Sequence, residues 1–186
     1  KPALGSNEQK IGDLYGAGMN EAKLNADGAA PLKPYLAAID GLKDNAAIAD
    51  YIIGNFAKGE QSVFGFFPGE DFKDAKNVIA YAYEGGISLP EKAYYSDAKY
   101  QEKRDAFVAH VEKMLVLGGV DAAAAKAQAQ TVLKFETRLA SASLDPISAR
   151  DPANQYHFVS LAEADKATPH FSCTKLFAAE NIKDAK

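Results

Sequence analysis

Two helix-forming stretches stand back to back in the middle of this chain, and they restrict its fold more than any other feature. In the first, Ser96 is the expected N-cap, and apolar residues recur at three- and four-residue steps until Gly118. In the second, Asp121 is the expected N-cap, and the same spacing continues until the chain breaks at Pro146. Since only a short glycine-containing link joins them, the two helices are predicted to be antiparallel neighbours.

Shorter elements are predicted on both sides of this pair. Capping and turn residues delimit helices from Ser6 to Gly28, from Pro31 to Gly41 and over residues 45–57, with short helices after Ser160 and near 174–179. Two runs of β-branched and aromatic residues, around Phe66 and Tyr81, flank a polar stretch and predict a β-hairpin with a long loop. The predicted fold class is mainly α: a multi-helix domain with two long antiparallel helices and one small β-hairpin.

Length and composition limit the classes of protein to consider. A chain of 186 residues with 47% hydrophobic residues can fill one sizeable core, so residues 1–186 are interpreted as a single helical domain. The net charge of −4 gives no reason to expect a nucleic-acid partner. No apolar run approaches the roughly 20 residues of a membrane span, so no membrane segment is expected. The chain starts at Lys1 without an initiator methionine, and we interpret it as a piece cut from a longer protein.

A series of short motifs follows in a distinctive order between Ile11 and Phe177. They are Leu14-Tyr15, Phe64-Gly65-Phe66, Asp71-Phe72-Lys73-Asp74, Gly85-Gly86-Ile87-Ser88-Leu89-Pro90, Tyr94-Tyr95, Phe135-Glu136-Thr137-Arg138-Leu139-Ala140, Arg150-Asp151-Pro152, Tyr156 and Pro169-His170-Phe171. Their order and spacing resemble the N-terminal, mainly helical region of the neprilysin family of zinc metallopeptidases. Gly18 stands where vertebrate members have a half-cystine, which suggests a bacterial oligoendopeptidase, and Cys173 replaces a tryptophan usual in the family.

The resemblance implies that the chemistry belongs to another part of the parent protein. Family members hydrolyse peptides with a zinc ion held by H-E-x-x-H and a downstream glutamate, and the glutamate of the motif is the general base. This chain has no H-E-x-x-H, so neither a catalytic residue nor a metal site is assigned to it, and zinc is expected in the missing catalytic domain. That domain and peptide substrates are the implied partners.

The role implied for this chain is enclosure of the substrate cavity. Together with the catalytic domain, the N-terminal helical domain would admit peptides and exclude folded proteins. Bacterial relatives are often exported, which favours a periplasmic or extracytoplasmic location. The alternative hypothesis is a freestanding helical module that binds peptides or another protein and has no enzymatic activity.

Metal or nucleophile sites within the chain itself are alternative hypotheses. His157, His170 and Cys173 could supply three zinc ligands, but their spacing matches no standard structural site. A nucleophile pair of Cys173 with His170 lacks an evident orienting residue. His110 begins an H-x-E sequence typical of zinc deaminases, but the P-C-x-x-C that completes that site is absent. The simpler interpretation is that these histidines lie at the surface or are partly packed.

Glu136 stands out because its position falls on or beside the apolar stripe of the second long helix. A buried carboxylate is costly unless it is paired. Arg150, which follows soon after that helix, is the predicted partner in a structural ion pair, with Arg138 and Lys134 as competitors. A direct contact with substrate is the alternative role for Glu136.

Three further residues are candidates for contacts with the cavity or with the catalytic domain. Asp151 precedes Pro152, a frequent first residue of helices, so the simpler role for Asp151 is that of a cap. Tyr94 and Tyr95 precede the first long helix, where packing is the simpler role for both rings.

Overall fold

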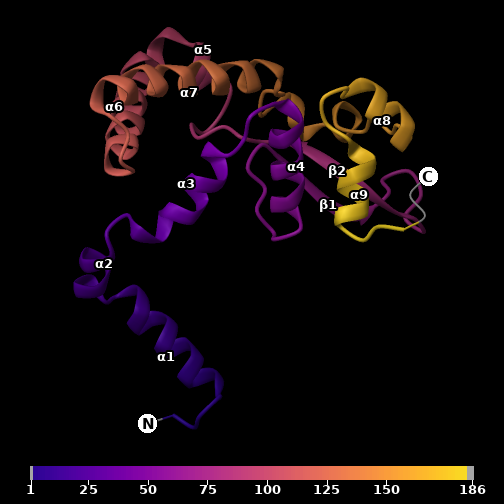
Figure 1. The fold of residues 1–186 in the computed structure, drawn as a ribbon. Helices are drawn as coiled ribbons and strands as arrows, with labels where there is room; N and C mark the ends of the chain where they lie inside the picture. The colour runs from indigo at the N-terminus through magenta and orange to yellow at the C-terminus, as the bar shows by residue number, and fades with distance from the viewer. Residues whose placement is uncertain (1, 184–186) are drawn as a thin grey trace. The chain divides into compact units, whose positions relative to one another are not determined.

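The computed structural model describes residues 2–183 and shows a mainly α fold with one small β-hairpin, as predicted (Figure 1). The elements are α1 (Asn7–Gly18), α2 (Glu21–Asp27), η1 (Ala30–Leu32), α3 (Lys33–Asp40), α4 (Asn45–Phe56), β1 (Phe64–Glu70), β2 (Val78–Glu84), α5 (Ala93–Ser96), η2 (Ala98–Tyr100), α6 (Gln101–Leu117), α7 (Ala122–Ala142), η3 (Ser148–Arg150), η4 (Pro152–Asn154), α8 (Leu161–Ala167) and α9 (Cys173–Ala179), where η denotes a 3₁₀ helix. The chain divides after Gly41 into two compact units.

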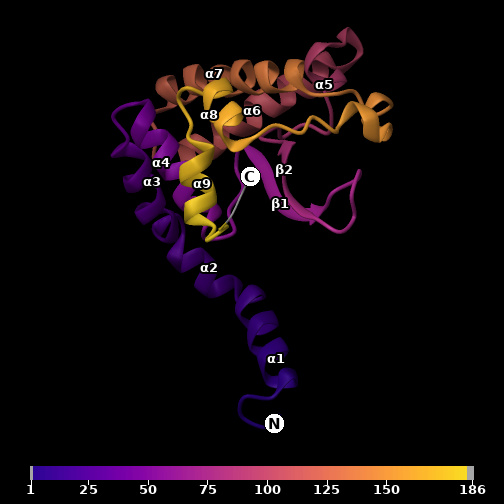
Figure 2. The same cartoon turned by 90° about the vertical axis from the view of Figure 1, so that its right-hand side faces the viewer.

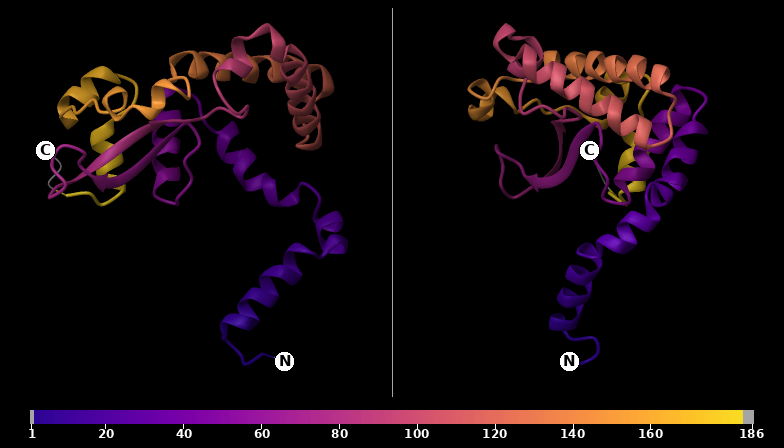
Figure 3. Two further views of the ribbon diagram at one scale, coloured as in Figure 1. Left: turned by 180° about the vertical axis from the view of Figure 1, so that it is seen from behind. Right: turned by 90° about the vertical axis from the view of Figure 1, so that its left-hand side faces the viewer.

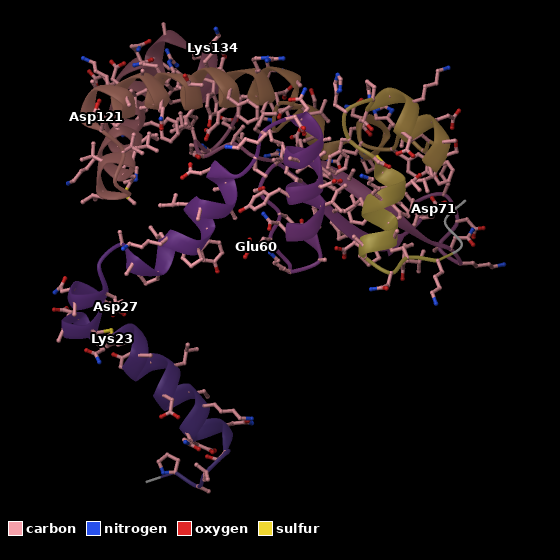
Figure 4. The ribbon with its side chains drawn as sticks, viewed as in Figure 1. Lys23, Asp27, Glu60, Asp71, Asp121 and Lys134 are labelled. Atoms are coloured by element: carbon pink, nitrogen blue, oxygen red, sulfur yellow. The ribbon has the colours of Figure 1, made fainter. Side chains whose placement is uncertain are left out.

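The first unit consists of α1, η1, α2 and α3. Ser6 caps α1 as predicted, since its hydroxyl accepts a hydrogen bond from the backbone N–H of Gln9 at 3.2 Å. The predicted single helix up to Gly28 is wrong, because Asn20 starts a new helix by accepting from the N–H of Lys23 at 3.0 Å. Lys23 also forms an ion pair with Asp27 across one turn of α2 at 2.6 Å (Figure 4).

No residue of α1, α2 or α3 is buried. Their apolar side chains remain open to solvent, with exposed fractions of 69% for Ile11 and 78% for Leu14 as examples. These helices therefore carry many apolar side chains but do not form a hydrophobic core of their own.

The hydrophobic core lies in the second unit, between the hairpin and two helices. Its buried residues are Ile53 and Phe56 of α4, Phe66 of β1 and Leu176 of α9. Figure 2 shows α4 and α9 side by side, and Figure 3 shows both on one face of the hairpin. The rings of Phe56 and Phe66 meet edge to face at 6.2 Å, one of the geometries that aromatic pairs prefer.

The hairpin pairs β1 with β2 in an antiparallel register that runs from Phe64 opposite Glu84 to Glu70 opposite Val78. Because side chains alternate across a strand, Phe66 points into the core while Phe67 and its opposite residue Tyr81 lie on the outer face. The predicted hairpin is confirmed.

The two long helices, α6 and α7, follow each other across a short link and pack against each other. Asp121 caps α7 as predicted, by accepting from the N–H groups of Ala123 and Ala124 at 2.9 and 3.2 Å. The predicted start of the first long helix at Ser96 is wrong. Asp97 has an extended backbone, with φ −73° and ψ 135°, so it separates α5 from η2 and α6.

In the C-terminal part of the chain, the structure has a helix where the capping residues predicted one. The helix predicted after Ser160 is α8, and Ser160 and Glu163 form a capping box at its start, in which each side chain accepts from the other residue's backbone N–H. Among residues 2–183, no helix combines the length and the apolarity needed to cross a membrane.

Candidate functional site

Glu136 lies on the inward face of α7, together with the three alanines that this face buries. Ala125, Ala129, Glu136 and Ala140 are separated by steps of four, seven and four residues, so they line one side of the helix. Only 7% of Glu136 is exposed. The preceding residue, Phe135, is 52% exposed, so α7 buries the side that carries Glu136.

Neutral donors satisfy the Glu136 carboxylate. Its Oε2 atom accepts from the backbone N–H of Ser88 at 2.9 Å and from the Tyr95 hydroxyl at 2.5 Å, and its Oε1 atom accepts from the Ser88 hydroxyl at 2.8 Å. The Tyr95 oxygen in turn accepts from the N–H of Leu89 at 2.9 Å. We call Ser88, Leu89, Tyr95 and Glu136 the Glu136 junction, because they connect α5, α7 and the segment after β2.

The environment of Tyr95 favours its neutral form. Burial raises the pKa of Tyr95 to about 12, and the hydrogen bond to Glu136 acts in the same direction. A phenol that keeps its proton can remain a donor to a carboxylate well above neutral pH. The Tyr95 hydroxyl therefore remains a hydrogen-bond donor to Glu136 near pH 7.

The predicted ion pair between Glu136 and Arg150 is not found among residues 2–183. Arg150 is exposed and lies in η3, beyond the end of α7 and the turn at Pro146. Glu136 is more than one helical turn before the end of α7, and its oxygens already have three donors. The structure thus corrects the partner of Glu136, while the expectation that this buried carboxylate needs partners holds.

Further contacts secure the same connection between the hairpin and α7. The Glu84 carboxylate at the end of β2 accepts from the N–H of Leu144 at 2.9 Å. Lys92 donates to the carbonyls of Ser141 and Ser143 at 3.0 and 2.9 Å, which satisfies acceptors at the C-terminal end of α7. Gly86 has a φ of 73°, and a Cβ atom there would lie 2.8 Å from a backbone oxygen, so only glycine fits.

Tyr94 and Asp151 lie outside the junction. The ring of Tyr94 stacks on Tyr100 with centroids 4.0 Å apart, and its carbonyl accepts from the guanidinium of Arg104 at 2.7 Å. Asp151 is exposed and caps η4 by accepting from the N–H of Ala153 at 2.9 Å. Of the predicted site residues, the structure therefore brings together only Tyr95 and Glu136.

The histidines and the cysteine do not gather into a site. His110, His157 and His170 are all exposed, and Cys173 is half-buried at the start of α9. The structure places no group of three or more His, Cys, Asp or Glu side chains that could hold a metal ion within the part of the chain it describes.

Ser88 and Arg104 make hydrogen bonds between elements that were not predicted from the sequence. Ser88 is the only polar side chain of the Gly85–Pro90 motif, which is the one signal that could have pointed to it. Arg104 is only 8% exposed and binds the carbonyls of Tyr94 and Asp97. Its position four residues before the buried Val108 places it on the inward face of α6, which the spacing could have revealed.

Known proteins match this chain along nearly its whole length. Neprilysin-3 of Drosophila melanogaster is 26% identical over 176 residues, which cover 84% of this chain and 22% of that protein. Human endothelin-converting enzyme 1 is 27% identical over 173 residues, covering 87% of this chain and 22% of the enzyme. The crystal structure of Mycobacterium tuberculosis zinc metalloprotease Zmp1 with an inhibitor is 26% identical, with a TM-score of 0.86 over 99% of this chain and 28% of Zmp1.

The chain thus spans less than a third of the length of these relatives. A family model for the N-terminal part of peptidase family M13 matches residues 1–186. This match agrees with the resemblance to neprilysin that the motif order indicated. The chain belongs to peptidase family M13, and it corresponds to the N-terminal region of that family.

Proposed function

We propose that this chain is the non-catalytic N-terminal domain of a neprilysin-like zinc metalloendopeptidase. The observation that carries the proposal is a match to the N-terminal family model over residues 1–186 in a chain that has no H-E-x-x-H. The zinc ion and the general base belong to the catalytic domain of the parent polypeptide, which is the first partner of this chain. Oligopeptides are the substrates of the parent.

The contribution of this chain is a rigid wall that encloses the substrate cavity and restricts access to it. The Glu136 junction supports that role, because it connects the end of the hairpin to the buried face of α7 through hydrogen bonds between segments far apart in sequence. Rigid elements hold a binding surface more precisely than free loops do.

Contacts with the catalytic domain or the cavity are proposed for Asp151, Tyr94 and Tyr95. Asp151 is exposed, so its carboxylate is accessible to a partner while it caps η4. Tyr95 is buried, so its contribution is indirect, through the position of the segment that it holds. We place the parent in the periplasm or another extracytoplasmic compartment, in keeping with the exported bacterial members of the family.

A second candidate function is a freestanding binding module without enzymatic activity. The exposed apolar side chains of α1, α2 and α3 favour it, since such residues often mark contact surfaces. A reading frame that continues into H-E-x-x-H beyond Lys186 would favour the peptidase, and a stop codon at that point would favour the binding module.

The test is a peptidase assay on this chain and on the full-length parent, each with added zinc and with a chelator. We expect activity only in the parent and its loss on chelation. A parent variant with the first histidine of H-E-x-x-H replaced by alanine serves as the inactive control. Zinc-dependent cleavage by this chain alone would contradict the proposal and would direct attention to His157, His170 and Cys173.

A further inference from the structure

The register of the hairpin determines which backbone groups point away from it. The N–H of Asp71 bonds to the carbonyl of Asn77 at 3.0 Å, so these two residues face each other across the two strands. In an antiparallel ladder such hydrogen-bonded pairs alternate with pairs whose N–H and C=O groups point outward. The residues with even numbers in β1 and β2 therefore present their backbone groups to the two outer edges.

The outer edge of β1 is protected. The side-chain amide of Gln61 donates to the carbonyl of Phe66 at 2.8 Å and accepts from its N–H at 3.0 Å, which occupies both outward groups of that residue. Pro68, at the next outward position, has no N–H to offer. A side-chain cap and a proline are two devices that prevent a further strand from adding to a sheet edge.

The outer edge of β2 has neither a side-chain cap nor a proline. Ala80 and Ala82 lie opposite Pro68 and Phe66, so their N–H and C=O groups point outward. Within residues 2–183 none of these groups has a partner. Val78, at the start of the same edge, is 72% exposed.

A groove of about 470 Å³ lies on the outer face of the hairpin, where Tyr81 and Tyr83 of β2 line part of it. Its aromatic lining is Phe67, Phe72, Tyr81 and Tyr83, and the two charged residues of the lining, Glu70 and Asp71, are both acidic. The backbone N–H of Lys73 holds the pKa of Asp71 below its usual range, and the Tyr156 hydroxyl also donates to this carboxylate, at 2.9 Å. Figure 4 labels Asp71 beyond the end of β1.

We propose that the outer edge of β2 and the adjoining groove bind an extended peptide as a third strand. Hydrogen bonds to the outward groups of Ala80 and Ala82 would supply affinity that does not depend on peptide sequence. Apolar or aromatic side chains on alternate positions of the peptide would pack against Tyr81 and Tyr83. A basic side chain would meet the carboxylate of Asp71, so the site selects cationic, apolar peptides.

This inference deepens the proposed function, since it names the class of peptide that the enclosing wall of the parent would capture. Peptide binding takes place at the hairpin and does not require peptidase activity. Its test therefore uses this chain and not the peptidase assay. If peptide binding fails while the parent is an active zinc peptidase, only the present inference fails. If peptide binds while the parent is inactive, only the proposed function fails.

The probe is a fluorescein-labelled ten-residue peptide in which valine and phenylalanine alternate with threonine and lysine. Fluorescence anisotropy measures its affinity, and amide NMR spectra of the labelled chain locate its contacts. We expect the signals of Ala80 and Ala82 to shift on addition of peptide. Ala82→Pro removes one outward donor without removing a bond between β1 and β2, and should weaken binding roughly five- to tenfold. Ala82→Ser keeps the donor and is the matched control.

Two altered peptides make the test independent of how well the variants fold. Methylation of every interior amide nitrogen keeps the side chains and removes the donors, and should abolish binding. Replacement of the lysines by glutamates should weaken it. Equal binding of the methylated peptide, equal affinities of Ala82→Pro and Ala82→Ser, or absence of binding would overturn the proposal. So would self-association of the chain through β2, seen by sedimentation, without peptide binding.

Discussion

Glu136 is a buried carboxylate whose hydrogen-bond donors are neutral groups and not a cation. Glu136 has donors from Ser88 and from Tyr95 in place of the arginine that the sequence suggested. Hydrogen bonds to a charged acceptor are stronger than those between neutral groups, so three of them offset much of the cost of burial. Loss of one donor should therefore be visible in stability.

Tyr95→Phe should lower the free energy of unfolding by about 1–3 kcal/mol near neutral pH, because it removes a donor to Glu136 and an acceptor for the N–H of Leu89. Thermal melting monitored by circular dichroism measures the loss. Tyr94→Phe is the matched control: its ring stacks on Tyr100, and no hydrogen bond of its hydroxyl is found among the described residues. Equal losses in both variants would contradict the role of the junction.

The pKa of Tyr95 is raised to about 12 in the folded chain, against the ordinary value of 10.0. A comparison of the stability of the wild type and of Tyr95→Phe at increasing pH should reveal this shift. Since the native state holds this proton more tightly, its stabilising contribution is complete below about pH 10 and is lost as the pH rises toward about 12. The stability difference between the wild type and Tyr95→Phe should therefore shrink over that interval. A difference that stays constant from pH 8 to 11 would show that Tyr95 does not titrate in this way.

At the scale of elements, local capping residues predicted helix starts well, and long-range contacts explain the failures. Asp121 and Ser160 cap α7 and α8 where the sequence placed them, because a cap bonds to N–H groups only two or three residues away. Ser96 failed as a cap because the chain turns at Asp97, whose carbonyl is held by the buried guanidinium of Arg104. The helix at Asn20 was missed because its cap lies within an otherwise helical pattern.

Asp121→Ala should lower the free energy of unfolding by about 1 kcal/mol, because it leaves the N–H groups of Ala123 and Ala124 without their acceptor. Urea denaturation measures this loss. Asp121→Ser keeps an acceptor at the same position and should cost only a few tenths of a kcal/mol. An alanine variant as stable as the serine variant would mean that this cap contributes nothing to the fold.

At the scale of the whole molecule, the two units differ in what stabilises them. The second unit contains the core of Ile53, Phe56, Phe66 and Leu176, whereas the helices of the first unit bury no residue. Burial of apolar surface is the dominant favourable contribution to folding. The interpretation of residues 1–186 as one domain remains a prediction, and the two units invite a direct test.

Removal of the residues up to Gly41 should leave a chain that unfolds cooperatively, with a melting temperature within about 3 °C of the original. The complementary peptide, residues 2–41, should be largely non-helical alone, because its helices of 12, 7 and 8 residues are at or below the roughly 12–15 residues that isolated helices need. Circular dichroism of both pieces is the measurement. A shortened chain without a cooperative transition would place part of the essential packing in the first unit.

The sequence by itself determined the features that depend on neighbours a few residues apart. The caps at Ser6, Asp121 and Ser160, the presence of the hairpin, the order of motifs that indicates peptidase family M13 and the absence of H-E-x-x-H could all be read from it. Only the tertiary structure decided which groups meet from distant segments: Ser88 and Tyr95 at Glu136, and Gln61 at the edge of β1. The physical reason is that the spacing of apolar residues predicts whether a segment is a helix or a strand, but it does not predict how far apart two such elements lie in the folded chain. Hydrogen bonds between distant segments depend on those distances.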